Sequence, residues 1–180
     1  MDCLFRGTKV KCVDRELASE ATKAVKMYKE AILNITSADT RGKKIDLLIK
    51  YGSTQGVEIS SNEFKSPQPT PIAALQQQCK NLRTNAAILN IIRSLDPRKS
   101  STHVAAVDWL GSVGYLYLMA DIDGLYYAQK VGILSLPRSL HDVPDFRSTL
   151  DSTLLPVRNF EFWIESYRCL GQTTRFRPAL

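Results

Sequence analysis

Two acidic residues and one lysine stand out because of where they fall in the sequence. Asp46 lies in the compact apolar segment 45–51, and Glu63 and Lys65, two positions apart, lie at the end of the segment 57–65. Residues two apart on a strand face the same way, and neighbouring strands of a hairpin bring facing side chains together. We therefore expect Asp46, Glu63 and Lys65 to project together from two adjacent antiparallel strands.

This combination suits the hydrolysis of phosphodiester bonds. Two carboxylates and a backbone carbonyl form a hard oxygen site of the kind that Mg²⁺ or Mn²⁺ prefers. A lysine ammonium beside that metal can orient the attacking water and screen the charge of a phosphate. The alternative is a solvated surface ion pair, which would contribute under ~1 kcal/mol to folding. Lys65 is the only lysine with an acidic residue two positions before it, which favours the site.

The residues before this pair show a helical pattern. Apolar residues recur at spacings of three and four from Arg15 to about Ser37, which predicts an amphipathic helix with Asp14 as its N-cap. A polar, basic connector follows, and the turn residues at 52–56 predict a hairpin between the two strands. Glu58, inside this hairpin, is interpreted as a surface charge.

A long helix is expected after the second strand. Pro71 suits a first helical position, because the amide that proline lacks would be unpaired there, and the helix is expected to end near Leu95. A helix of this length that joins two strand regions can cross one face of the sheet. The apolar stripe that we expect to be buried against the sheet consists of Ile72, Leu75, Cys79, Leu82, Ala86 and Leu89.

The second half of the chain predicts three further strands and then helices. The strands are expected at 103–109, 113–120 and 125–136, in a meander. Ser139 and Asp142 resemble a capping box, and a final helix is expected to carry Phe160, Trp163, Ile164 and Tyr167 on one face. The predicted fold class is α/β, a mixed β-sheet flanked by helices, in a single domain over 1–180 with a frayed tail at 171–180.

Composition agrees with a globular protein and limits its partners. The chain has 180 residues, of which 44% are apolar and 23% charged, so one domain with a substantial core is expected. No apolar run approaches the ~20 residues that span a bilayer, and the N-terminus lacks a signal-peptide core. We expect a protein that is not secreted, in the nucleus or cytoplasm, with no membrane partner. The net charge of +6 favours polyanions such as nucleic acid.

Several other site classes lack support in the sequence. The four cysteines form no CxxC pair, and the histidines His103 and His141 are interpreted as structural, so a zinc centre is not expected. The phosphate-binding GxxxxGK[ST], the dinucleotide-binding GxGxxG and the nucleophile motif GxSxG are all missing. The segment 111–114 has the GxxG spacing of a KH loop but no basic residue between its glycines, which favours a hairpin turn.

The order of these elements and residues resembles the PD-(D/E)XK nuclease superfamily, over Arg15 to Trp109. The resemblance implies a Mg²⁺-dependent (or Mn²⁺-dependent) endonuclease acting on DNA, in which Asp46 and Glu63 bind the metal and Lys65 is the catalytic lysine. It also implies a nucleic-acid-binding role for the basic connector residues Arg41, Lys43 and Lys44 at the mouth of the site. The segments around Asp46, Glu63, 76–85 and 108–109 are similar to a multiplied group of fungal proteins.

Some families of this superfamily add a glutamine or a glutamate to the site. Of the glutamines at 76–78, Gln78 flanks the apolar stripe and is the candidate, while Glu20 and Glu30 are weaker ones on the first helix. Two departures are visible: Ile45 replaces the proline of the family name, and the first core strand before Asp46 is missing or shrunk to about 41–44. Because the sheet is trimmed, the alternative function is a catalytically inactive module that binds a partner or nucleic acid.

Aromatic residues in the last three strands allow two interpretations. Aromatic rings on a sheet can stack on unpaired bases, although packing in the core is the favoured interpretation here. The residues concerned are Trp109, Tyr115, Tyr117, Tyr126 and Tyr127.

Overall fold

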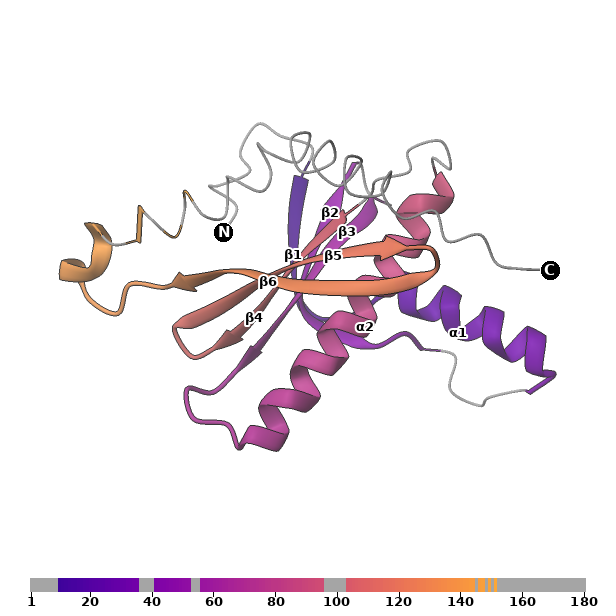
Figure 1. Cartoon of the computed structure of the whole chain (residues 1–180), viewed down its shortest axis with the longest axis horizontal. Coiled ribbons are helices and arrows are strands. Elements are labelled where there is room, and N and C mark those ends of the chain that lie inside the picture. The colour runs from indigo at the N-terminus through magenta and orange to yellow at the C-terminus, as the bar shows by residue number, and fades with distance from the viewer. Residues whose placement is uncertain are drawn as a thin grey trace, which may run out of the picture.

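The computed structural model describes residues 10–35, 41–52, 56–95, 103–144, 146–147, 149 and 151, with the backbone alone at 14–17. Within these residues the elements follow the order β1 (Val10–Ala18), α1 (Glu20–Leu33), β2 (Lys44–Tyr51), β3 (Val57–Lys65), α2 (Pro71–Leu95), β4 (His103–Leu110), β5 (Val113–Ile122), β6 (Leu125–Ser135) and a 3₁₀ turn at Leu140–Asp142 (Figure 1). The predicted helix with Phe160 and Tyr167, and the tail at 171–180, lie outside the described residues.

The six strands form one sheet in sequence order, from β1 at one edge to β6 at the other. Neighbouring strands are antiparallel except β3 and β4, which are parallel. Parallel neighbours need a crossover, and α2 supplies it by packing on β3, β4 and β5 (Figure 1). The predicted α/β fold with a mixed sheet is confirmed.

The hairpins between the last strands also agree with the sequence. Gly111, at the turn from β4 to β5, has a φ of 61°, and Asp123 and Gly124, between β5 and β6, have φ values of 53° and 83°. Two consecutive positive φ values are typical of the tight type I′ turn that Asp-Gly favours. The GxxG segment is therefore a hairpin turn, as predicted, and not a KH loop.

The start of the chain differs from the prediction. Val10–Ala18 forms an edge strand paired with β2, where the sequence predicted the first turn of a helix. The helix begins only at Glu20, with Ser19 and not Asp14 as its N-cap. The strand next to β2 thus comes from before α1, and the expected short strand at 41–44 is not needed. Val10–Ala18 becomes a strand because its backbone groups can form hydrogen bonds with the open edge of β2. This pairing outweighs the helical preference of the segment, since a single helical turn is only marginally stable.

Glu58 was wrongly interpreted as a surface charge. It is 7% exposed, and its carboxylate accepts hydrogen bonds from Ser19 Oγ at 2.7 Å and from the backbone N–H groups of Glu20 at 2.8 Å and Ala21 at 3.2 Å. These amides are the unpaired donors at the start of α1, where a negative charge is favourable. Glu58 therefore fixes the start of α1 to β3.

Helix α2 buries only the C-terminal part of the predicted apolar stripe, where Leu89 is buried and Leu82 and Ala86 pack against the core. Ile72 and Leu75 are 70% and 59% exposed, and Cys79 is exposed as well. The buried residues of the helix are Gln77, Asn81, Thr84, Asn85, Ala87, Ile88 and Leu89. The N-terminal half of α2 thus packs polar side chains against the sheet, and the prediction failed because it assumed that a buried helix face must be apolar.

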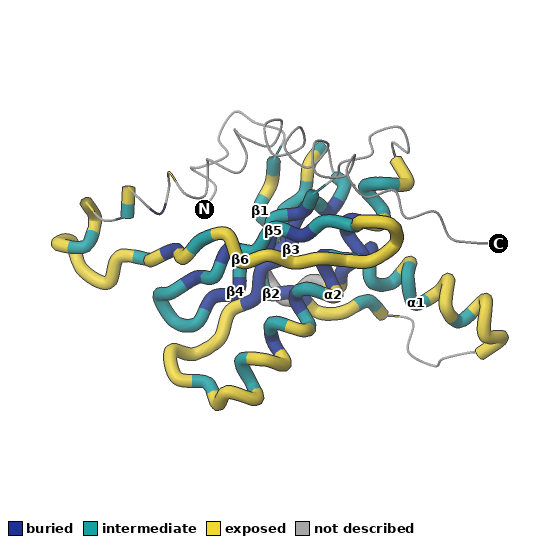
Figure 2. The backbone as a smooth tube through the Cα atoms, viewed as in Figure 1, coloured by how far each residue is buried: buried dark blue, intermediate teal, exposed yellow. Residues whose placement is uncertain are grey.

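The buried residues lie mainly in the strands of the sheet and on α2 (Figure 2), and the apolar ones form two clusters, one on each face of the sheet. On the side of α2 the cluster contains Ile45, Leu48, Ile88, Leu89, Val104 and Met119, among others. On the other side Trp109 packs with Leu116 and Leu134. No helix of the described residues has the length and apolar character needed to cross a membrane.

Candidate functional site

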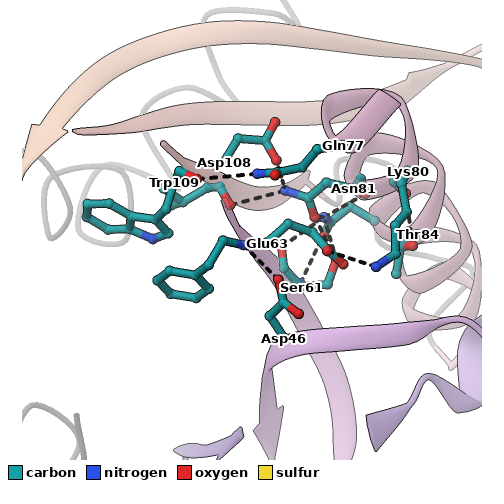
Figure 3. Close-up of polar contacts among 12 residues, drawn as sticks. Asp46, Ser61, Glu63, Gln77, Lys80, Asn81, Thr84, Asp108 and Trp109 are labelled. Atoms are coloured by element: carbon teal, nitrogen blue, oxygen red, sulfur yellow. Dashed lines mark hydrogen bonds and ion pairs between the residues drawn. The ribbon is translucent and has the colours of Figure 1, made fainter. Parts of the chain in front are cut away.

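Asp46 and Glu63 lie at the same end of two paired strands. Strands β2 and β3 are antiparallel neighbours, and the last pair of their ladder is Leu47 with Asn62, so Asp46 and Glu63 come next along each strand. Asp46 Oδ2 accepts the backbone N–H of Phe64 at 2.8 Å (Figure 3). The prediction that the two carboxylates lie on adjacent strands is confirmed.

Glu63 is a buried carboxylate with one cationic partner. It is 3% exposed, and its Oε2 pairs with Lys80 Nζ at 2.8 Å. Burial raises the pKa of Glu63; the hydrogen bond and charge of Lys80 oppose this rise, while the charges of Asp46 and Asp108 add to it. Glu63 Oε1 finds no hydrogen-bond partner within the described part of the chain. One oxygen of this buried carboxylate therefore has no hydrogen-bond donor among the described residues.

The sequence missed Lys80 as the partner of Glu63. Lys80 lies on α2 close to three buried polar residues of the same helix. It follows Gln77 by three positions and precedes Asn81 by one and Thr84 by four. This polar stripe was a usable signal, because residues three and four apart share a helix face.

Lys65, the predicted catalytic lysine, is exposed where β3 ends. Its neighbour across the parallel ladder is Leu110 on β4, and its backbone oxygen accepts the N–H of Gly111 at 2.9 Å. Strand alternation sends its side chain to the same side of β3 as that of Glu63. The cation that contacts the Glu63 carboxylate is nevertheless Lys80.

A third carboxylate, Asp108, lies beside Glu63 in the sheet. The two residues are register partners on the parallel strands β3 and β4. Asp108 is 4% exposed; its Oδ1 accepts from Asn81 Nδ2 at 2.7 Å, while Oδ2 has no hydrogen-bond partner among the residues described. Burial raises the pKa of Asp108, and the amides of Asn81 and Gln77 partly offset the rise. Asp108 is thus held by neutral amides, whereas Glu63 has a lysine.

A buried amide network attaches α2 to the two strands that carry these acids (Figure 3). Asn81 Nδ2 donates to Asp108 and to the Val107 carbonyl at 3.1 Å, and Asn81 Oδ1 accepts from Ser61 Oγ at 2.9 Å. Asn85 accepts from the backbone N–H of Ser61 at 2.9 Å and donates to its carbonyl at 3.0 Å. Because both asparagines are fully buried and bonded on several sides, they fix the position of α2 and therefore of Lys80.

The three glutamines of α2 point to different places. Gln76 is exposed, Gln77 is buried and donates to the Trp109 carbonyl at 3.4 Å, and Gln78 donates to the hydroxyl of Tyr117 at 2.6 Å. The prediction of Gln78 assumed that the apolar stripe around it is buried, but Leu75 and Cys79 on either side of it are exposed. Because the buried face is turned by about one residue, Gln77 and not Gln78 lies beside an acidic residue, Asp108.

Lys29, Lys80 and Arg83 gather around Lys43 and form with it a basic cluster, of which Lys43 and Lys80 are within electrostatic reach of Glu63. Burial lowers the pKa of Lys43, and the positive charges of Arg83, Lys80 and Lys29 lower it further, against the opposing charge of Glu63. Each of these groups is therefore within electrostatic reach of Lys43, a predicted nucleic-acid-binding residue. Arg41 and Lys44 are exposed on either side of the short stretch that carries it. Such a concentration of cations attracts phosphate groups.

The weaker glutamate candidates have other partners. Glu20 forms an ion pair with Lys23 at 3.7 Å and Glu30 with Lys26 at 4.0 Å, both within α1. Neither pair includes a residue of the site around Glu63.

Asp46 and Glu63 supply two carboxylates, the type of oxygen ligand that Mg²⁺ takes. No cluster of three or more His, Cys, Asp or Glu residues suited to a metal occurs in the described ranges. Mg²⁺, however, usually keeps several waters and is held through one or two carboxylates together with substrate phosphates. The unpaired Oε1 of Glu63 and the neighbouring carboxylate of Asp46 meet that smaller requirement.

Comparisons with protein-family models, with curated proteins and with solved structures found no match. A function must therefore be argued from the residues of the site.

Proposed function

We propose that this chain is a Mg²⁺-dependent (or Mn²⁺-dependent) nuclease-like domain of the PD-(D/E)XK type, which hydrolyses phosphodiester bonds of DNA. The observation that carries the proposal is the neighbouring pair Asp46 and Glu63 at one end of a hairpin, with Lys43 and Lys80 of the basic cluster within electrostatic reach of Glu63. Acidic residues that bind a metal and cations that bind phosphate are the two requirements of metal-assisted phosphodiester hydrolysis.

The proposal assigns separate roles to the residues. Asp46 and Glu63 bind the metal, which when bound activates a water and polarises the phosphate. Lys43 and Arg83 hold the phosphate backbone, because Lys43 is within electrostatic reach of both Glu63 and Arg83 and the ion pair of Glu63 is with Lys80. Lys80 takes the place that the motif gives to Lys65, because its ammonium lies 2.8 Å from Glu63. Lys65 remains available to the DNA strand at the exposed end of β3.

Nicking of supercoiled plasmid with Mg²⁺ or Mn²⁺, alongside calorimetric titration of Mn²⁺, tests these roles. We expect Asp46→Asn to weaken metal binding, because a neutral amide attracts a dication far less than a carboxylate does. Lys80→Met should lower cleavage by about 10²-fold or more while metal binding survives, because a protonated lysine offers the metal no lone pair. Glu20→Gln, an exposed change on α1, is the matched control and should cleave like the wild type.

A wild-type protein that neither cleaves DNA nor binds metal would contradict the proposal. Cleavage that survives Asp46→Asn would mean that other residues carry the reaction.

The Glu63–Lys80 ion pair favours a second candidate, a catalytically inactive module that binds nucleic acid. Lys80 neutralises Glu63 without any metal, which a domain that no longer needs metal would retain. This candidate predicts salt-dependent DNA binding that Asp46→Asn leaves unchanged and no nicking by the wild type.

A further inference from the structure

Phe64 and Trp109 form a parallel aromatic stack next to the candidate site. Their ring centroids are 6.0 Å apart and their planes differ by 6°. They are register partners on the parallel strands β3 and β4. Trp109 is 5% exposed, whereas Phe64 is 38% exposed. Phe64 is therefore the outer ring of the stack, and solvent reaches it.

The stack is built rigidly into the sheet. Trp109 lies over Gly114 on β5 so closely that a Cβ at Gly114 would be 2.8 Å from the indole ring, and only glycine leaves room there. The backbone N–H of Phe64 is held at 2.8 Å by Asp46 Oδ2. An aromatic ring fixed in this way loses little entropy when a second flat ring binds to it.

We propose that the exposed ring of Phe64 binds an unpaired nucleobase by stacking, so that the strand bound at this site is single-stranded. The inference rests on the proposed function. Glu63 and Phe64 point to opposite sides of β3, and the sugar of a nucleotide separates its base from its phosphate. One nucleotide strand can thus place a phosphate among the basic cluster and a base on Phe64, around the exposed end of β3. A base inside a duplex has both faces stacked already, so an unpaired base is the ligand that fits.

Fluorescence anisotropy of two labelled oligonucleotides separates stacking from phosphate binding. One is oligo-dT, and the other is an abasic strand of the same length, which keeps the phosphates and lacks the bases. We expect wild-type protein to bind oligo-dT more tightly than the abasic strand. Phe64→Leu, which keeps an apolar side chain without a flat π face, should lower the affinity for oligo-dT about 5- to 150-fold, the usual worth of one stacked base. Phe64→Tyr, which keeps the flat ring, should bind oligo-dT like the wild type.

The abasic strand serves as the internal control. All three proteins should bind it equally, because phosphate contacts do not involve Phe64. Equal binding of oligo-dT by wild type and Phe64→Leu would overturn the stacking inference and leave the nuclease proposal to the plasmid assay. A parallel loss for both strands in Phe64→Leu would also overturn it, because the ring would then only support the fold. Oligo-U in place of oligo-dT distinguishes RNA from DNA as the source of the base.

Discussion

Glu63 and Asp108 lie side by side in the sheet, yet α2 gives them different partners. Lys80 compensates the charge of Glu63, while Asp108 receives hydrogen bonds from neutral amides only. A buried charge without a counter-charge is costly, and an acceptor without a donor adds to that cost. Burial of the Asp108 carboxylate therefore lowers the free energy of unfolding of the protein.

Replacing this carboxylate should stabilise the protein. Because burial raises the pKa of Asp108, the folded protein binds its proton more tightly than the unfolded chain does. Stability from this group is therefore greatest at low pH and is lost as the pH rises from about 4 through the raised pKa. We expect Asp108→Asn to raise the free energy of unfolding at pH 7 by about 1–3 kcal/mol and to flatten its decline with pH, as measured by urea denaturation from pH 4 to pH 8.

The exposed control Glu20→Gln should stay within about 0.5 kcal/mol of the wild type over the same range. A loss of stability in Asp108→Asn at pH 7 would show that the carboxylate is favourably paired after all.

At the scale of elements, contacts far apart in the sequence decide where each helix is attached. Helix α1 is attached through Ser19 and Glu58, which are 39 residues apart. Gly42 allows the chain to pass close by, because a Cβ there would be 2.1 Å from the backbone oxygen of Ser19. Helix α2 is attached through the side chains of Asn81 and Asn85, which form hydrogen bonds with Ser61 on β3.

Removing the charge of Glu58 should loosen α1. Glu58→Gln keeps the size of the side chain, but an amide is a weaker acceptor for Ser19 and offers no negative charge to the helix start. We expect a loss of about 1–2 kcal/mol in the free energy of unfolding, together with faster hydrogen exchange of the α1 amides. Glu20→Gln, in the first turn of the same helix but exposed, should cost only a few tenths of a kcal/mol. Equal effects of the two changes would mean that burial of Glu58 adds nothing.

At the scale of the whole molecule, the net charge of +6 is less informative than the place where cations gather. Lys29 comes from α1, Lys43 from the connector before β2, and Lys80 and Arg83 from α2. These elements meet only in the folded chain, where the charges of Lys29, Lys80 and Arg83 act on Lys43. The fold thus turns a modest overall charge into a local one.

The salt dependence of nucleic-acid binding measures this local charge. Lys43→Gln and Arg83→Gln should each lower the slope of log K against log salt by about 0.7 for single strands and about 0.9 for duplex DNA, since each removes one phosphate contact. Lys130→Gln is the control, because Lys130 lies on β6 over the ring of Tyr115. Anisotropy titrations at salt concentrations from about 50 to about 300 mM give the slope for each variant. An equal change for all three variants would show that binding follows total charge.

The sequence by itself determined the hairpin with Asp46 and Glu63, the crossover helix and the meander of β4 to β6. These features depend on local signals: alternation in strands, proline at a helix start, and glycine or aspartate in tight turns. Such signals act within a few residues and need no knowledge of the rest of the chain.

Only the tertiary structure decided that Val10–Ala18 pairs with β2, that Glu58 caps α1, and that Lys80 and not Lys65 contacts Glu63. Each is a contact between segments that are far apart in the sequence, where more than one residue could pair with the same backbone groups or the same buried charge. Such a contact stabilises the protein only when both segments are in place. A polar helix face becomes the buried one when the strands beneath it carry acids and amides that need partners. The apolar pattern of α2, taken alone, therefore indicated the wrong side for the N-terminal part of the helix.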